Sequence, residues 1–289
     1  MSDYVIITDT SADIPADVLD KGQIKLIPMV YQLNGEECPH KNPGNWDSKA
    51  FYDKLRAGGT GSTSQISPAT YTEYFEPFLK DGKDILYISL SGGLTSTWQS
   101  SHIAATDLQE AYPERRISCI DSLAATGGQG ILVILAAKNQ EKGMSLKENA
   151  AWLEENRLHI CHWFTVDDLD FLKRGGRISP TIAWIGGKLK IKPILRIVED
   201  GTLAIPEKVR GSKAAMNTIV SKYISSGINE EYPYVFICHG DATEQAQKEK
   251  EAILEAVPQA QVTIMPMSPI IGIHTGPGVQ AVIYFGNNR

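Results

Sequence analysis

The sequence predicts two α/β domains, an N-terminal one with a parallel sheet covered by helices on both faces and a C-terminal one with a mixed sheet. Short β-branched runs alternate with helical segments through the first half, which is the rhythm of βαβ units. The pattern changes near residue 145, and Asp200-Gly201 between two apolar runs is a strong hairpin signal. A chain of 289 residues is long enough for two domains.

The first half contains the elements expected for the parallel sheet. Residues 4–8 form an apolar run typical of a buried strand, and the helix expected at 14–21 has Pro15 in its first turn, where proline is tolerated. The other elements predicted here are strands at 24–31, 84–89 and 116–120, helices at 47–57, 68–80, 96–111 and 127–142, and loops at 34–44 and 58–65. Because helices separate these strands, the strands should run parallel.

The second half begins with a helix expected at 146–156. The sequence then predicts strands at 159–166, 191–198, 203–209, 234–239 and 262–266, helices at 213–225 and 244–256, and a short helix at 166–177 that a glycine pair ends. The apolar runs 270–273 and 279–285 indicate two further strands. We place the domain boundary so that residues 1–158 form the N-terminal domain and residues 159–289 the C-terminal domain.

Composition and charge narrow the class of protein. The net charge is −6 and no basic stripe compensates for it, so we expect no nucleic acid partner. The first residues show neither a basic region nor a long apolar run, and the longest apolar stretch, 129–137, is too short to span a membrane. The four cysteines are scattered, which favours reduced thiols. We therefore expect a cytoplasmic protein without a signal peptide.

A metal site could in principle draw on the histidines and cysteines of the second half, namely His159, Cys161, His162, Cys238 and His239. Neighbouring side chains of an extended strand point to opposite faces, so at least one member of each adjacent pair would point away from a shared ion. Ligand type without converging geometry is weak evidence for zinc. We therefore expect no metal and no cofactor.

The stretch His274-Thr275-Gly276-Pro277-Gly278 is the strongest candidate for a functional loop. It places an imidazole and a hydroxyl together at a turn between two expected strands, and its glycines let backbone N–H groups approach a ligand. A turn that only reverses the chain would not need these two side chains. The alternative is that Gly-Pro-Gly serves the turn alone and the histidine is an ordinary surface residue.

We expect three hydroxyl-rich loops of the first half, at residues 8–11, 62–65 and 89–97, to lie at the carboxyl ends of the strands. In open α/β sheets ligands bind beyond the carboxyl ends of the strands, and hydroxyls with free N–H groups at a helix N-terminus favour anions. The third loop lacks the lysine of a P-loop, and no acidic cluster suggests magnesium. The loops therefore suit a single carboxylate better than a nucleotide.

An acyl hydrolase or acyltransferase is the alternative function. Its nucleophile would be Ser64, Thr95 or Ser96, and His274 with Asp9 would complete a triad. The chain has no Gly-x-Ser-x-Gly nucleophile elbow. Hydroxyls that bind a carboxylate would lie near a histidine in any case, so an apparent triad is weak evidence for catalysis. We therefore favour a binding protein over an enzyme.

Five motifs resemble those of the DegV family of fatty-acid-binding proteins, in the same order along essentially the whole chain. Residues 8–13 resemble the family's Thr-Asp-Ser-x-x-Asp, residues 63–66 its Thr-Ser-Gln-Pro, residues 94–100 its Leu-Ser-Gly-Thr-Tyr-Gln-Ser, residues 172–178 its Leu-Lys-x-Gly-Gly-Arg-Ile and residues 274–278 its His-x-Gly-Pro-Gly. This chain has Ile66 for the proline, Thr95 for a serine and Ser96 for a glycine. None of these departures removes a hydrogen-bonding group.

The resemblance implies that one long-chain fatty acid lies between the two domains. The side chains implied to bind its carboxylate are Thr63, Thr95, His274 and Thr275, with Ser64 and Ser96 as second choices. The residues implied to support the site are Arg177, which would order the interdomain loop, Gly276 and Gly278. The family also implies that the protein does no chemistry itself. It would present the carboxylate to a separate fatty acid kinase subunit, whose acyl phosphate feeds phospholipid synthesis.

The acyl tail would need an apolar lining near these motifs. The candidates are Phe171, Ile178, Ile182, Trp184, Ile185, Ile271 and Ile273. Residues 182–190 combine apolar and basic side chains, which is typical of a segment that touches a membrane surface transiently. The alternative for this segment is a structural helix end.

Overall fold

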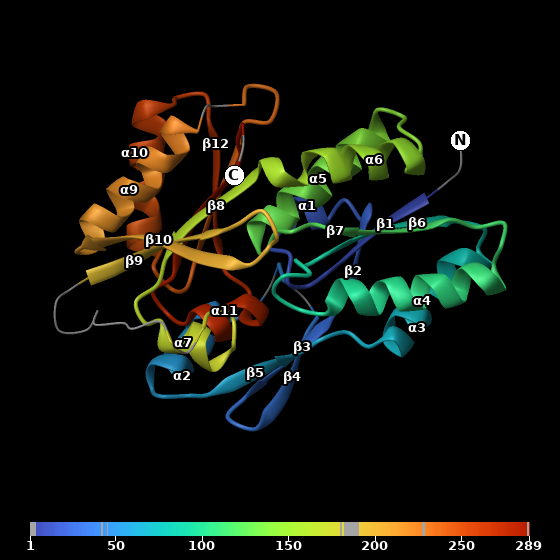
Figure 1. Ribbon diagram of the computed structural model, residues 1–289, viewed down its shortest axis with the longest axis horizontal. Helices are drawn as coiled ribbons and strands as arrows, with labels where there is room; N and C mark the ends of the chain where they lie inside the picture. Colours follow the sequence, from blue (N-terminus) through green and yellow to red (C-terminus); the bar gives the residue numbers. More distant parts are fainter. Residues whose placement is uncertain are drawn as a thin grey trace.

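The computed structural model describes residues 4–41, 43–44, 46–179, 181, 191–226, 229–287 and 289. It confirms two α/β domains, with a parallel sheet in the N-terminal half and a mixed sheet in the C-terminal half (Figure 1). A third, small antiparallel sheet lies below them in the view of Figure 1. The segment 182–190, with Ile182, Trp184, Ile185 and the expected membrane contact, lies outside the described residues.

The N-terminal sheet has the strand order β2-β1-β6-β7, and all neighbours are parallel. Its strands are β1 (Tyr4–Asp9), β2 (Ile24–Ile27), β6 (Asp84–Ser89) and β7 (Ile117–Asp121). One face is covered by α3 (Pro68–Lys80) and α4 (Thr97–Ala111), and the other by α1 (Ala16–Leu19), α5 (Gly127–Glu141) and α6 (Leu146–Asn156) (Figure 1). Because both faces are buried, the central strands are continuous apolar runs.

The C-terminal sheet has the order β10-β9-β8-β13-β11-β12, in which only the β11–β12 pair is parallel among the described strands. Its strands are β8 (Ile160–Thr165), β9 (Ile191–Ile197), β10 (Leu203–Arg210), β11 (Tyr234–His239), β12 (Gln261–Pro266) and β13 (Gln280–Phe285). A short 3-10 turn (Arg157–His159) leads into β8. The outer face is covered by α9 (Ser212–Ser225) and α10 (Thr243–Ala256).

Helix α5 lies between the two large sheets and contacts strands of both. Twelve of its 15 residues are buried, which explains why the run 129–137 is apolar on all sides of the helix. A side chain at Gly128 would collide with the ring of His162 on β8, so glycine lets the helix approach the sheet closely. No helix of the described residues is long and apolar enough to cross a membrane.

The small sheet, with order β4-β3-β5, differs from the sequence prediction. The strand expected at 24–31 is two strands in different sheets, β2 and β3 (Met29–Leu33), because Pro28 between them has no N–H for a ladder. The two expected loops contain β4 (Glu36–His40) and β5 (Gly61–Ser64). Glycine, serine and threonine in β5 give no alternating apolar pattern. The helix expected at 47–57 is α2 (Ser48–Arg56), and it packs beside this sheet.

The strand expected at 270–273 is also wrong, because Pro269–Thr275 forms the helix α11. Ser268 stands at the N-cap and Pro269 at the first helical position, where a missing N–H costs nothing. Gly276, with a φ of 75°, ends the helix. His274 therefore lies in the last turn of a helix and not in a turn between strands. Helix α7 (Asp170–Arg174) is shorter than the helix expected at 166–177.

Candidate functional site

A cavity of about 460 Å³ is lined by residues from both halves of the chain. Ligand pockets for small molecules fall in the same range of volume. Its polar lining residues are Thr63, Gln65, Thr95, Ser96, Thr126, His162, Arg177, His274 and Thr275. Its apolar lining residues are Met29, Leu90, Leu94, Ala125, Phe164, Leu172, Ile197, Leu203, Met267, Ile270, Ile271, Ala281 and Ile283.

The central polar contact of the cavity joins the small sheet to α11. The hydroxyl oxygen of Thr63, on β5, lies 2.8 Å from Nε2 of His274. Nδ1 of His274 is buried and has no hydrogen-bond partner in the part of the chain that the structure describes. It faces Gly175, where any side chain would collide with the ring. A glycine at this position therefore gives the imidazole the space that it occupies.

His274 is neutral at ordinary pH. Burial, with a smaller contribution from the nearby charge of Arg177, lowers the pKa of His274 to about 3. A neutral imidazole carries one ring proton. With that proton on Nε2, His274 donates to the Thr63 oxygen, and the Thr63 hydroxyl keeps its own proton for another acceptor. The pair can therefore donate a hydrogen bond to a ligand oxygen without supplying a positive charge.

The third hydroxyl-rich loop reaches the cavity at the N-terminus of α4. The hydroxyls of Thr95 and Thr97 lie 3.0 Å apart, and Thr95 lines the cavity with Ser96. Ser96 is the N-cap residue, but its side chain makes no capping hydrogen bond. The first N–H groups of α4 thus receive no hydrogen bond from the N-cap side chain, and the positive end of the helix lies beside the cavity.

Arg177 links this loop to the second half of the chain. Its Nε donates to the backbone oxygen of Leu94 over 3.2 Å, and a terminal nitrogen donates to the backbone oxygen of Gly175. Burial lowers the pKa of Arg177 from its ordinary value, but an arginine stays charged in proteins. Among the described residues no carboxylate pairs with it. A cation that has no carboxylate partner within the described part of the chain therefore lines the cavity.

Of the remaining residues expected at the site, Thr275 lines the cavity and three others do not. Thr275 lines the cavity, but its hydroxyl donates within α11, to the backbone oxygen of Ile271 over 3.2 Å. Ser64 is exposed and does not line the cavity, because successive side chains of β5 point to opposite faces. Gly276 and Gly278 also lie outside the lining, and both have positive φ. They shape the backbone that returns from α11 to β13.

The sequence analysis did not identify most of the apolar residues that line the cavity. Of the described candidates only Ile271 lines the cavity. Phe171 and Ile273 pack with the aromatic side chains of α2, and Ile178 lies in the main core. Part of the lining comes from β8 and β13, where Ala281 pairs with Phe164 and Ile283 with His162. Alternation along these two strands is the signal that could have indicated the shared face.

The first hydroxyl-rich loop is structural and does not line the cavity. Asp9 is fully buried, and its carboxylate accepts hydrogen bonds from Ser11, Gln129 and, over 2.8 Å, Tyr87. Burial raises the pKa of Asp9. Because Asp9 is engaged here and Nδ1 of His274 has no partner among the described residues, the geometry lacks the acid that a catalytic triad needs.

Within the described residues no group of three His, Cys, Asp or Glu side chains could hold a metal ion. Of the residues considered for zinc, His162 turns Nε2 toward the backbone of Ala125, 3.2 Å from its oxygen. His239 accepts from the N–H of Ala242 over 3.1 Å. The thiols of Cys161 and Cys238 are buried, and burial raises their pKa values to about 11 and about 12. These side chains serve the interior of the fold.

Fold and cavity together define a two-domain α/β protein with a largely apolar cavity and a neutral hydrogen-bonding pair at its wall. A family model described as uncharacterised protein, DegV family, matches residues 3–287. A DegV domain-containing protein from Clostridium perfringens is 38% identical over 289 residues, which is 100% of this chain and 99% of that protein. The chain belongs to the DegV family, as the five motifs indicated.

Two solved structures show how closely the fold is shared. The fatty acid binding DegV family protein from Streptococcus agalactiae is 26% identical, with a TM-score of 0.87 over 100% of both chains. The fatty acid kinase B3 protein from Streptococcus pneumoniae, solved loaded with linoleic acid, is 23% identical. Its TM-score is 0.85, and the match covers 99% of this chain and 100% of that one.

Proposed function

We propose that this protein binds one long-chain fatty acid in the cavity, between a domain of residues 1–158 and a domain of residues 159–289. The observation that carries the proposal is the Thr63–His274 pair at the wall of a mostly apolar cavity. Hydroxyls and a neutral imidazole suit a carboxylate, and the apolar lining suits an acyl chain. A solved family member is itself described as fatty acid binding.

The carboxylate would accept hydrogen bonds from Thr63 and from the hydroxyls of Thr95 or Ser96, which line the same cavity. Such charge-assisted bonds offset the loss of hydration. Arg177, which lacks a carboxylate partner among the described residues, would supply the balancing positive charge nearby. Each buried methylene contributes about 0.8 kcal/mol, so a long chain gains on the order of 10 kcal/mol before the cost of association.

We further propose that the protein has no catalytic role of its own, acts in the cytoplasm and presents the bound carboxylate to a separate fatty acid kinase subunit. The acyl phosphate formed there would enter phospholipid synthesis. This part rests on the five family motifs. A pKa of about 3 makes the His274 imidazole a weak base, and its Nδ1 has no acid partner among the described residues, so the pair favours binding over nucleophilic catalysis.

Native mass spectrometry of the purified protein tests the binding function directly. We expect a bound species with the mass of a long-chain fatty acid, and we expect delipidated protein to take up stearic or linoleic acid. Thr63→Val removes the hydroxyl at nearly constant volume and should reduce the retained lipid. Exposed Ser64→Val, one residue away on the other face of β5, is the matched control. Delipidated protein that takes up neither acid would refute the function.

A further inference from the structure

Helix α2 lies against the helix that carries His274. It precedes β5, the strand of Thr63, by only a few residues, and it packs on α11. Gly272 of α11 stands where the rings of α2 approach, since a Cβ there would lie 2.5 Å from the Tyr52 hydroxyl oxygen and 3.0 Å from Phe51. The docking of α2 and the Thr63–His274 contact therefore both involve α11, and β5 follows α2 closely in the chain.

Tyr52 fastens α2 to the beginning of α11. Its side chain is 0% exposed, and its hydroxyl donates to the backbone oxygen of Met267 over 2.8 Å. Met267 lines the cavity and immediately precedes Ser268, the N-cap residue of α11. Removal of the Tyr52 hydroxyl would leave the buried backbone oxygen of Met267 without this hydrogen bond.

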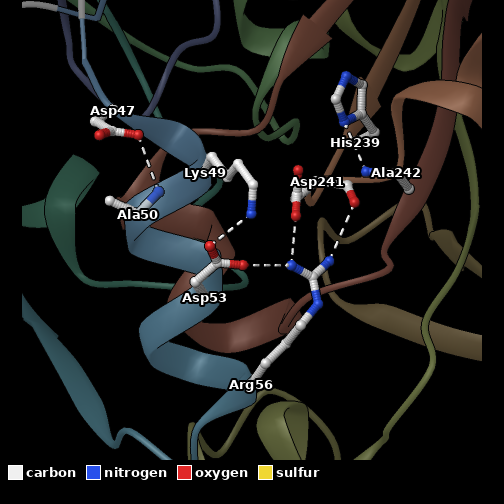
Figure 2. Close-up of polar contacts among 8 residues, drawn as sticks. All are labelled: Asp47, Lys49, Ala50, Asp53, Arg56, His239, Asp241 and Ala242. Atoms are coloured by element: carbon white, nitrogen blue, oxygen red, sulfur yellow. Dashed lines mark hydrogen bonds and ion pairs between the residues drawn. The ribbon is translucent and has the colours of Figure 1, made fainter.

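Arg56 binds the next turn of α2 to Asp241, which follows β11 (Figure 2). It lies four residues after Tyr52, on the same side of the helix. Figure 2 shows its guanidinium donating to the carboxylate of Asp241, and a second nitrogen donates to the Asp241 backbone oxygen over 3.1 Å. The same guanidinium contacts Asp53 over 3.2 Å. Two-point binding of one residue by a guanidinium fixes direction as well as distance.

The residues that Tyr52 and Arg56 bind, Met267 and Asp241, follow neighbouring strands. Asp241 follows β11 and Met267 follows β12, and the last residues of these parallel strands, His239 and Pro266, are paired. Tyr52 and Arg56 thus hold α2 across the carboxyl ends of β11 and β12. The chain then turns at once into β5, which brings Thr63 to the end of α11.

We propose that Tyr52 and Arg56 are positioning residues for the Thr63–His274 pair. They hold α2 across the ends of β11 and β12 and so set β5 against α11 at the distance that the hydrogen bond requires. The inference rests on the proposed function only for its effect on fatty acid affinity. The position of the pair can be observed without a ligand.

Nitrogen-15 spectra of the histidine rings in ligand-free protein test the positioning itself. We expect Tyr52→Phe and Arg56→Met to shift the ring nitrogens of His274 in the direction that Thr63→Val shifts them. Lys49→Met is the matched control, because Lys49 also lies on α2 but pairs only with Asp53 among the described residues. Assignment comes from His274→Ala. His274 signals that stay at their wild-type positions in both variants would overturn the inference, whatever the protein binds.

Affinities for stearic acid and for stearyl alcohol test the consequence. Loss of one buried hydrogen bond should weaken stearic acid binding about tenfold in Tyr52→Phe. The half-exposed ion pair should cost about threefold in Arg56→Met. The affinity for stearyl alcohol, which has no carboxylate, should fall less than the affinity for stearic acid. In protein that already carries Thr63→Val, Tyr52→Phe should weaken stearic acid binding little further. Equal losses for acid and alcohol, or an undiminished loss in that background, would make Tyr52 merely structural and overturn the inference.

Discussion

Glu249 should make the stability of this protein fall as the pH rises through neutrality. Its side chain on α10 is 0% exposed, within the apolar cluster that α9 and α10 form on the C-terminal sheet. Both carboxyl oxygens lack a hydrogen-bond partner among the described residues. Burial without such compensation raises the pKa of Glu249 to about 8.

The sign and the size follow from proton linkage. Between the ordinary pKa of 4.5 and about 8, the folded protein keeps a proton on Glu249 that the unfolded chain releases. The free energy of unfolding therefore declines across this window as the pH rises. At about 1.4 kcal/mol for each pH unit, the full window corresponds to about 5 kcal/mol, which is comparable to the total stability of many domains.

Urea unfolding of wild type and Glu249→Leu at a series of pH values measures this directly. The variant should gain several kcal/mol relative to wild type between pH 5 and pH 8.5, because leucine carries no proton to lose. Asp9 and Asp13 are buried too, but both are present in the two proteins and cancel in the difference. Exposed Glu251→Leu, on the same helix, is the control. Stability curves that stay parallel over the whole range would refute the reasoning.

Three further predictions concern the cavity. Because burial lowers the pKa of His274 to about 3, stearic acid affinity should show no titration of this residue between pH 6 and pH 8, and a pH dependence in that range that disappears in His274→Ala would contradict this. Gly175→Ala should push the His274 ring aside and weaken stearic acid about tenfold in equilibrium titrations, whereas unchanged affinity would show that the ring has room to move. Ala281→Leu should fill part of the apolar lining and shift the preference toward acids that are shorter by about two or three carbons, because each methylene that no longer fits loses about 0.8 kcal/mol of burial. Competition between acids of different length measures this preference, and the same preference in variant and wild type would contradict the prediction.

The sequence predicted the large sheets well where pattern and local signals agree. Pro68–Lys80 has the expected bounds because Ser67 caps the helix and Pro68 begins it, and both act locally. The small sheet was missed for an equally physical reason. Strand β5 is held by its ladder to β3 and by the approach of Ile273 to Gly61, and neither contact leaves an apolar period in its own residues.

The polar end of the cavity was easier to foresee than its walls. Hydroxyls and a histidine outside regular apolar patterns attract attention in a sequence, and Thr63, Thr95 and His274 all line the cavity. Wall residues such as Phe164 and Ile283 look like any other core residue of a strand. Whether an apolar side chain meets another side chain or an open space depends on the distance between layers, which no local pattern records.

Helix α11 shows why one motif can be found correctly and still be misread. The run Ile270–Ile273 fits a strand or one turn of helix equally well, because it is too short for its period to be counted. Ser268 at the N-cap and Pro269 at the first helical position favour the helix. Tyr52 packs against it, because its ring lies close to Gly272 and its hydroxyl donates to the backbone oxygen of Met267. In the helical form His274 turns toward Thr63, and the N–H of Gly278 donates to Gly240 over 2.7 Å, which leads the chain into β13. The glycines of the motif thus end a helix and lead into a strand, while His274 and Thr275 line the cavity.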